Sequence, residues 1–191
     1  WSYDKDQLLE EKSSNGGRYI MKGVLQKANT LNQNGRIYPI EILSREIRNY
    51  QKFIAERRAL GELDHPESSV VELKNASHII TEAHMEGDVC YGTVEILSTP
   101  AGDILKSLVD SGVTLGISSR GVGSTRREGE NQVVQDDFQL ICWDFVSEPS
   151  TPGAFMMKEG KEINEADLNK VFNKSDRVDR ILNDILTWGN K

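Results

Sequence analysis

The sequence predicts an α+β fold, with several strands, one clear hairpin, separate helices and an amphipathic helix that ends the chain. The clearest observation is a hairpin: residues 76–85 alternate in part, and a turn at 86–88 leads into a second strand at 89–97. Residues 40–58 place apolar side chains at helical spacing, and residues 100–111 form a shorter helical segment. Local strand pairs with separate helices indicate the α+β class.

The elements before this hairpin follow from local signals. Residues 1–17 are polar and end in a cluster of Ser, Asn and Gly, which predicts a mobile lead-in. Residues 18–28 look like a first strand, and the Asn-Gly pair within residues 32–36 predicts a turn. The helix over 40–58 follows Pro39, a residue that suits the first turn of a helix. Its apolar stripe consists of Ile40, Leu43, Ile47, Tyr50 and Ile54.

The second half of the chain predicts one helix, two strands and a helical end. Pro100 begins the shorter helix, and Gly112 lies just past its end. Strands over 113–124 and 132–146 are joined by a charged loop. From Asn164 the pattern is that of an amphipathic helix or helix pair, and it does not distinguish a helix packed on the body from a docking helix or pro-segment. Its apolar positions are Leu168, Val171, Phe172, Val178, Ile181, Leu182, Ile185 and Trp188.

Composition and charge bound the function. The 191 residues suffice for one domain and an appended element, and the formal charge of −7 argues against a nucleic-acid-binding surface. No run approaches the ~18 apolar residues that would span a bilayer, so no membrane partner is expected. Cys90 and Cys142 lie in apolar runs without metal-ligand spacing, which is typical of buried free thiols. We therefore expect no metal and no other cofactor.

Two serines among glycines are the first candidates for chemistry. Ser118 and Ser119 lie within residues 116–123, at the end of an apolar run. A serine becomes a useful nucleophile when a neighbouring base takes its proton. Neither serine has glycine both two residues before and two after, so the nucleophile elbow of α/β-hydrolases does not fit. The glycines permit close approach of a substrate, or the strand simply ends at a turn.

His65 and Asp144 are the candidate partners. His65 lies in the turn-rich segment 61–66, where it is either a general base or an exposed surface histidine. Asp144 lies inside the apolar run 141–146, and a buried carboxylate is costly unless it is paired. Orienting a histidine would provide that pairing, whereas an aspartate at a strand end facing water would need none. Weaker candidates for the same role are Glu62, Asp64 and Glu148.

Four segments together resemble the prohead core proteases of tailed bacteriophages, of the T-even myovirus type. They occur in the family's order, cover roughly residues 18–155, and are followed by no matching motif beyond Pro152. The segments are NQNGRIYP at 32–39, GELDHP at 61–66, GISSRGVGS at 116–124 and DFVSEPS at 144–150.

The resemblance implies the assemblin-like fold shared with herpesvirus maturation proteases. That fold is a mainly antiparallel β-barrel or curved sheet with flanking helices, to which this chain adds the C-terminal amphipathic helix. The expected domains are a lead-in over 1–17, a serine protease domain over 18–155 and a C-terminal helical segment over 156–191.

The resemblance also implies a serine endopeptidase that forms an acyl-enzyme. The family's general base corresponds to His65 and its nucleophile to Ser118, a choice that strand alternation alone does not make. Herpesvirus relatives use a second histidine as the third residue, whereas position and burial favour Asp144 here. We expect Arg120 to anchor the oxyanion site, so that its substitution lowers turnover far more than stability. The candidate oxyanion donors are the backbone N–H groups near Ser119, Arg120 and Gly121.

The biology follows from the same resemblance. Family members are packaged as zymogens in the prohead, in the host bacterial cytoplasm, where they cleave scaffold and major capsid proteins and finally themselves. T-even members cleave after Glu in an [Ile/Leu]-x-Glu context. Ile163-Asn164-Glu165 matches this context, so we expect autocleavage between Glu165 and Ala166, and a second match ends at Glu10. A homo-oligomer is compatible with the sequence, and no residue decides its size.

Two other functions compete with this one. The first is a non-catalytic capsid core or assembly protein on the same fold, in which the triad is incidental. The joint presence of His65, Ser118 and Asp144 argues against it, because a structural role requires no such set. The second is an unrelated binding module, and the acidic charge of the chain is the only observation that supports it.

Overall fold

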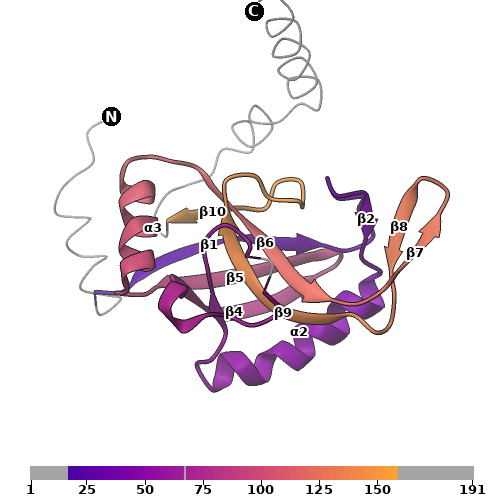
Figure 1. Cartoon of the computed structure of the whole chain (residues 1–191), viewed down its shortest axis with the longest axis horizontal. Coiled ribbons are helices and arrows are strands. Elements are labelled where there is room, and N and C mark those ends of the chain that lie inside the picture. The colour runs from indigo at the N-terminus through magenta and orange to yellow at the C-terminus, as the bar shows by residue number, and fades with distance from the viewer. Residues whose placement is uncertain (1–16, 67, 159–191) are drawn as a thin grey trace, which may run out of the picture. The chain divides into compact units, whose positions relative to one another are not determined.

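A seven-stranded sheet carries most of the protein (Figure 1). The computed structural model describes residues 17–66 and 68–158. The strands lie in the order β3-β4-β5-β1-β10-β6-β9, and each neighbouring pair is antiparallel. They are β1 (Tyr19–Lys27), β3 (Leu60–Gly61), β4 (His78–Glu86), β5 (Val89–Ile96), β6 (Leu115–Val122), β9 (Gln139–Val146) and β10 (Phe155–Lys158).

The segment that begins with β3 nearly closes this sheet into a barrel. β3 pairs with β4 at one edge of the sheet. The chain then runs beside β9 at the other edge, where Leu63 and Phe145 form a parallel bridge. Asp64 N donates to Phe145 O at 2.9 Å, and Phe145 N donates to Glu62 O at 3.0 Å. The predicted mainly antiparallel, curved, barrel-like sheet is therefore confirmed.

Two helices flank the sheet, as predicted. Helix α2 (Ile40–Ala55) packs its buried stripe, which includes Leu43, Ile47 and Tyr50, against the sheet. Helix α3 (Pro100–Asp110) is capped by the Thr99 side chain, which accepts a hydrogen bond from Gly102 N at 3.0 Å. A short 3₁₀ turn, η1 (Leu73–Asn75), precedes β4. Of the helices in the described part of the chain, neither is long and apolar enough to cross a membrane.

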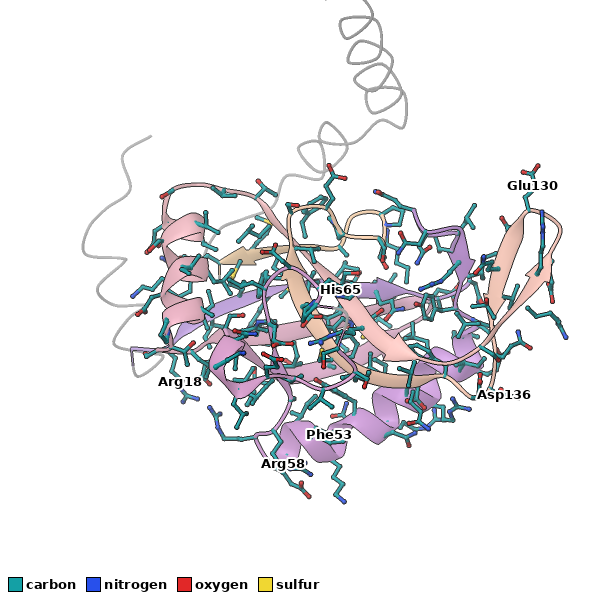
Figure 2. The ribbon with its side chains drawn as sticks, viewed as in Figure 1. Arg18, Phe53, Arg58, His65, Glu130 and Asp136 are labelled. Atoms are coloured by element: carbon teal, nitrogen blue, oxygen red, sulfur yellow. The ribbon has the colours of Figure 1, made fainter. Side chains whose placement is uncertain are left out.

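Two features differ from the elements that the sequence predicted. The charged loop expected over 125–131 instead contains β7 (Thr125–Glu128), which forms a hairpin with β8 (Asn131–Val134), and Glu130 lies near its tip (Figure 2). The single strand expected over 132–146 is accordingly divided into β8 and β9. Every side chain of β7 is exposed, so no apolar alternation marks it as a strand. β8 also pairs in parallel with β2 (Arg36–Ile37), which makes a separate three-stranded sheet. The second difference is β10, which lies between β1 and β6.

The alternation of β6 and β9 separates the core from the face that carries the candidate residues. Ile117, Trp143 and Phe145 are almost completely buried in the apolar core. Side chains alternate across a strand, so Ser118 and Asp144 lie on the opposite face. The predicted lead-in up to residue 16, the C-terminal helix and the cleavage sites at Glu165–Ala166 and Glu10 lie outside the described residues.

Candidate active site

The register of β6 and β9 brings Ser118 and Asp144 together. The two residues are direct partners across the strands, which places their side chains on one face about 5 Å apart at Cβ. Ser119 is instead the partner of Trp143, whose indole lies in the core. Ser118, and not Ser119, therefore shares the face of Asp144.

His65 completes the pair from the loop that follows β3 (Figure 2). Its Nδ1 atom lies 2.9 Å from Oδ2 of Asp144. The carboxylate is fully buried, whereas the imidazole is 39% exposed. A ring nitrogen facing a carboxylate carries the proton, so Nδ1–H donates to Asp144 and Nε2 is left as an acceptor. The arrangement suits an imidazole that takes up a proton from a neighbouring hydroxyl.

The backbone at His65 is held in an unfavourable conformation. Asp64 and His65 have φ angles of 64° and 50°, in the left-handed region that side-chain-bearing residues avoid. Such strain costs on the order of 1–3 kcal/mol per residue and persists only where the surroundings enforce it. The enforcing contacts are the hydrogen bonds to Phe145 and a bond from Glu62 N to Oδ1 of Asp144 at 3.0 Å. The loop is thus shaped by the strand that carries its partner.

A buried ion-pair network lies directly behind the His65–Asp144 pair. The Arg120 side chain is 7% exposed and contacts the fully buried carboxylates of Glu62 and Asp144. Nε of Arg120 lies 2.9 Å from Oδ2 of Asp144, and one terminal nitrogen donates to Glu62 Oε2. Another donates to Ser68 O at 2.6 Å. Two carboxylates share one guanidinium, so the ionised group carries one net negative charge.

This network keeps Asp144 ionised. Burial raises the pKa of Asp144, but the hydrogen bonds from His65 and the Glu62 amide, together with the charge of Arg120, outweigh it. The pKa of Asp144 therefore lies below its ordinary value. An ionised carboxylate against Nδ1–H can orient an imidazole and stabilise its protonated form.

The Ser118 hydroxyl faces a fourth segment. Its Oγ lies 3.1 Å from Oγ of Ser150, on the loop that leads from β9 to β10. Within residues 17–66 and 68–158, Ser118 makes this hydrogen bond and makes none to His65. Gln33 N donates to Ser150 O at 2.8 Å, so the turn at 32–36 holds this loop in place. All four sequence segments that carried the resemblance thus meet around Ser118.

Two residues at this site were missed or underweighted at the level of sequence. Ser150 lay inside the DFVSEPS segment, but no spacing rule pointed to a hydroxyl beside Ser118. Glu62 was a weaker candidate for orienting His65, and its carboxylate instead pairs with Arg120. The other weak candidates, Asp64 and Glu148, are exposed. In the sequence, an acidic residue at a buried position of the GELDHP segment was the one signal that could have indicated the Glu62–Arg120 pair.

The second histidine near the site, His78, is held by hydrogen bonds in the protein interior. His78 is fully buried, and its Nε2–H donates to Trp143 O at 2.9 Å while Ser77 Oγ donates to Nδ1 at 2.8 Å. Burial lowers the pKa of His78 to about 4, so the ring is neutral. A Cβ on Gly61 would lie 2.2 Å from Trp143 O and 2.3 Å from His78 Nε2, which explains the glycine before Glu62. Within the described part of the chain, no group of three or more His, Cys, Asp and Glu side chains could hold a metal ion.

The chain is similar to known proteins in sequence and in fold. The model of one protein family, described as prohead core protein serine protease, matches residues 5–168. The chain is 34% identical over 155 residues to the prohead core protein protease of Enterobacteria phage T4. The aligned region covers 78% of this chain and 72% of that protein. The chain is also similar to the solved structure of the bacteriophage T4 capsid assembly protease, with a TM-score of 0.66 and 29% identity over 68% of this chain and 82% of the other.

Proposed function

Since the chain belongs to the prohead core serine protease family of bacteriophages, we propose that it cleaves peptide bonds with a Ser118, His65 and Asp144 triad. A role as a phage capsid assembly protease follows from the family. The observation that carries the triad is the position of Asp144, which contacts His65 Nδ1 at 2.9 Å and is the cross-strand partner of Ser118.

The residues divide the work as follows. His65 Nε2 accepts the proton of the Ser118 hydroxyl as Oγ attacks the scissile carbonyl. Asp144 holds Nδ1–H and stabilises the imidazolium that forms. The proton then passes to the leaving amine, an acyl-enzyme remains on Ser118, and water hydrolyses it. Ser118 Oγ can accept a hydrogen bond from Ser150 while its own proton passes to His65, and catalytic hydrogen bonds are often loose before substrate binds.

Ser119 is the best placed of the proposed oxyanion donors. Ile117 N donates to Ala154 O at 2.9 Å, toward the β10 edge of β6. N–H groups alternate between the two edges of a strand, so the Ser119 N–H points to the same edge, just beyond the start of β10. The Arg120 N–H points to β9 instead, and a bulge separates Arg120 from Gly121. One preorganised donor contributes about 3 kcal/mol to the transition state.

The buried contacts of Arg120 change one expectation. Its guanidinium neutralises Glu62 and Asp144 rather than facing a substrate. Removing one partner of a buried ion pair is strongly destabilising. We therefore expect substitution of Arg120 to lower fold stability as well as turnover.

The proposed substrates are scaffold and major capsid proteins inside the prohead, cut after Glu in an [Ile/Leu]-x-Glu context. The chain itself offers Glu165–Ala166 and the bond after Glu10 as sites of autocleavage. The protease domain proposed over 18–155 extends in the sheet to Lys158, at the end of β10.

One observation favours the non-catalytic alternative. The Ser118 hydroxyl is bonded to Ser150 and not to His65, as it would be if the triad were incidental. Reactivity separates the two functions, because only an activated serine attacks a serine-directed phosphonate.

The deciding experiment compares wild type, Ser118→Ala and Ser119→Ala by intact-mass spectrometry after treatment with a fluorophosphonate. We expect one adduct on wild type and on Ser119→Ala, and none on Ser118→Ala. Incubation of the untreated proteins at high concentration should release a fragment near Glu165 from the same two. A label that persists in Ser118→Ala, or is absent from all three, would refute the triad.

A further inference from the structure

Lys27 places an unpaired cation near the site. It is the last residue of β1 and is half-buried, whereas its neighbours Gln26 and Ala28 are fully buried. Its side chain therefore points away from the core. The ammonium lies 3.7 Å from the position that a Cβ on Gly153 would occupy. It makes no hydrogen bond or ion pair with another side chain among residues 17–66 and 68–158.

Gly153 connects Lys27 to Ser118. β10 pairs Phe155 with Gly116, and the bond from Ile117 N to Ala154 O continues that pairing. Gly153 lies in the turn between Ser150, whose Oγ is 3.1 Å from Ser118 Oγ, and Ala154. Neighbouring strands are about 4.8 Å apart, so β1 and β6, on either side of this segment, are separated by about 10 Å. A substrate residue next to the scissile bond spans that distance with its backbone and an extended side chain.

Charge explains why a cation is needed there. The other cation of the site, Arg120, is shared between Glu62 and Asp144. Two carboxylates surround this single guanidinium, so it offers no free positive charge to an acidic substrate. An acidic side chain therefore requires a second, unshared cation, and a lysine ammonium serves as a point charge for a carboxylate.

We infer that Lys27 binds the carboxylate of an acidic substrate residue beside the scissile bond and so sets the cleavage preference. The inference rests on the proposed protease site and adds a residue that recognises the substrate. It does not involve the groups that move protons.

The test uses the full chain and two peptides that differ in one group. One peptide spans 163–166 with flanking residues, and its partner carries Gln in place of Glu165. We expect Lys27→Met to lower kcat/KM for the Glu peptide about 10- to 100-fold, as for loss of a hydrogen bond to a charged group. The Gln peptide should change by less than about threefold, and Lys27→Arg should retain most of the preference. Lys52→Met, on the exposed end of α2, is the matched control.

A binding measurement keeps the inference testable when turnover is slow. In a Ser118→Ala background, Lys27→Met should weaken binding of the Glu peptide and leave the Gln peptide unchanged. Equal losses on both peptides, or no loss on either, would overturn the assignment of Lys27. This inference alone fails if wild type and Lys27→Met label equally with fluorophosphonate and also show the same ratio of kcat/KM for the Glu peptide to kcat/KM for the Gln peptide. If wild type does not label at Ser118, the proposed function fails and takes the inference with it.

Discussion

His65 and His78 both contact β9, yet their surroundings differ in almost every respect. His65 lies on a strained, exposed loop and meets the side chain of Asp144. His78 lies in β4 and is fully buried. It contacts the backbone carbonyl of Trp143, the residue before Asp144. The first ring has an ionised partner, and its second nitrogen makes no hydrogen bond within the part of the chain that the structure describes, whereas both nitrogens of the second ring are occupied.

The difference shows what a histidine needs in order to carry a proton in this fold. Burial against neutral partners holds His78 in its neutral form, because no nearby group stabilises the charged ring enough. The ring of His65 instead faces a buried carboxylate and is partly exposed to solvent. Gly61 packs against His78, and Glu62 N donates to Asp144, the partner of His65, so one short segment contacts the surroundings of both rings.

The largest expected effect separates the two histidines by activity. His65→Gln should lower kcat/KM by about 10⁴-fold or more, as for loss of a triad member, while the free energy of unfolding changes by less than about 1 kcal/mol. Peptide cleavage and urea unfolding measure the two quantities. His84→Gln, which removes another exposed histidine, is the control and should leave both unchanged. A stable, fully active His65→Gln variant would remove His65 from the triad.

The next effect concerns the network behind His65. Arg120→Met leaves Glu62 and Asp144 buried without their cation and should lower the free energy of unfolding by about 3–5 kcal/mol. Arg126→Met removes an exposed pair with Glu128 and should cost about 0–1 kcal/mol. Urea denaturation of both variants measures the two losses of unfolding free energy and shows whether the first is larger. Similar small losses in the two would mean that the Arg120 network is not desolvated in solution.

The environment of His78 predicts a pH dependence of stability. Its pKa is lowered from 6.5 to about 4 on folding, so the unfolded chain binds the proton first as the pH falls. This stability is complete above pH 6.5 and is lost between pH 6.5 and about 4, by roughly 3 kcal/mol. Asp144, with its lowered pKa, adds a further loss only at lower pH. Unfolding free energies measured across this range should slope for wild type and flatten for His78→Gln, and parallel slopes would contradict the assignment.

The smallest effect tests the hydroxyl beside Ser118. Ser150→Ala removes one neutral hydrogen bond, worth about 1 kcal/mol, and should lower kcat up to about tenfold with KM unchanged. Ser147→Ala, an exposed serine earlier in the same loop, should have no effect. Steady-state kinetics on both variants decide the matter. Unchanged or faster turnover in Ser150→Ala would mean that the Ser118–Ser150 bond does not help to orient the nucleophile.

Local patterns in the sequence predicted much of this fold. The hairpin of β4 and β5 and both helices were predicted to within a few residues, because alternation, helical spacing and Pro signals are local. β10 was missed because only four residues follow a Pro-rich and Gly-rich loop, and its partners lie far away in sequence. The β7 strand was missed because it has no buried side chain.

The candidate site could be predicted by residue type but not by arrangement. The cost of burying an aspartate in an apolar run pointed to Asp144, and its position as partner of Ser118 rather than Ser119 required the register of β6 and β9. The burial of Arg120 between Glu62 and Asp144 depends on the closure of the barrel, which no local pattern encodes. The approach of Ser150 to Ser118 likewise depends on a distant segment, since Gln33 in the turn at 32–36 holds that loop.

The segment from β3 to Asp64 touches both edges of the sheet and then delivers His65. Its contact with β9 joins residues more than 80 positions apart in the chain, such as Glu62 and Asp144, which are 82 apart, and contacts of that range are slow to form because a long loop must close first. Under the proposed mechanism, a newly synthesised chain has its serine in the polypeptide long before it has its base in position. Closure of the barrel is then also the step that arms the protease, so a chain that has not closed its barrel cannot cut the proteins being made around it.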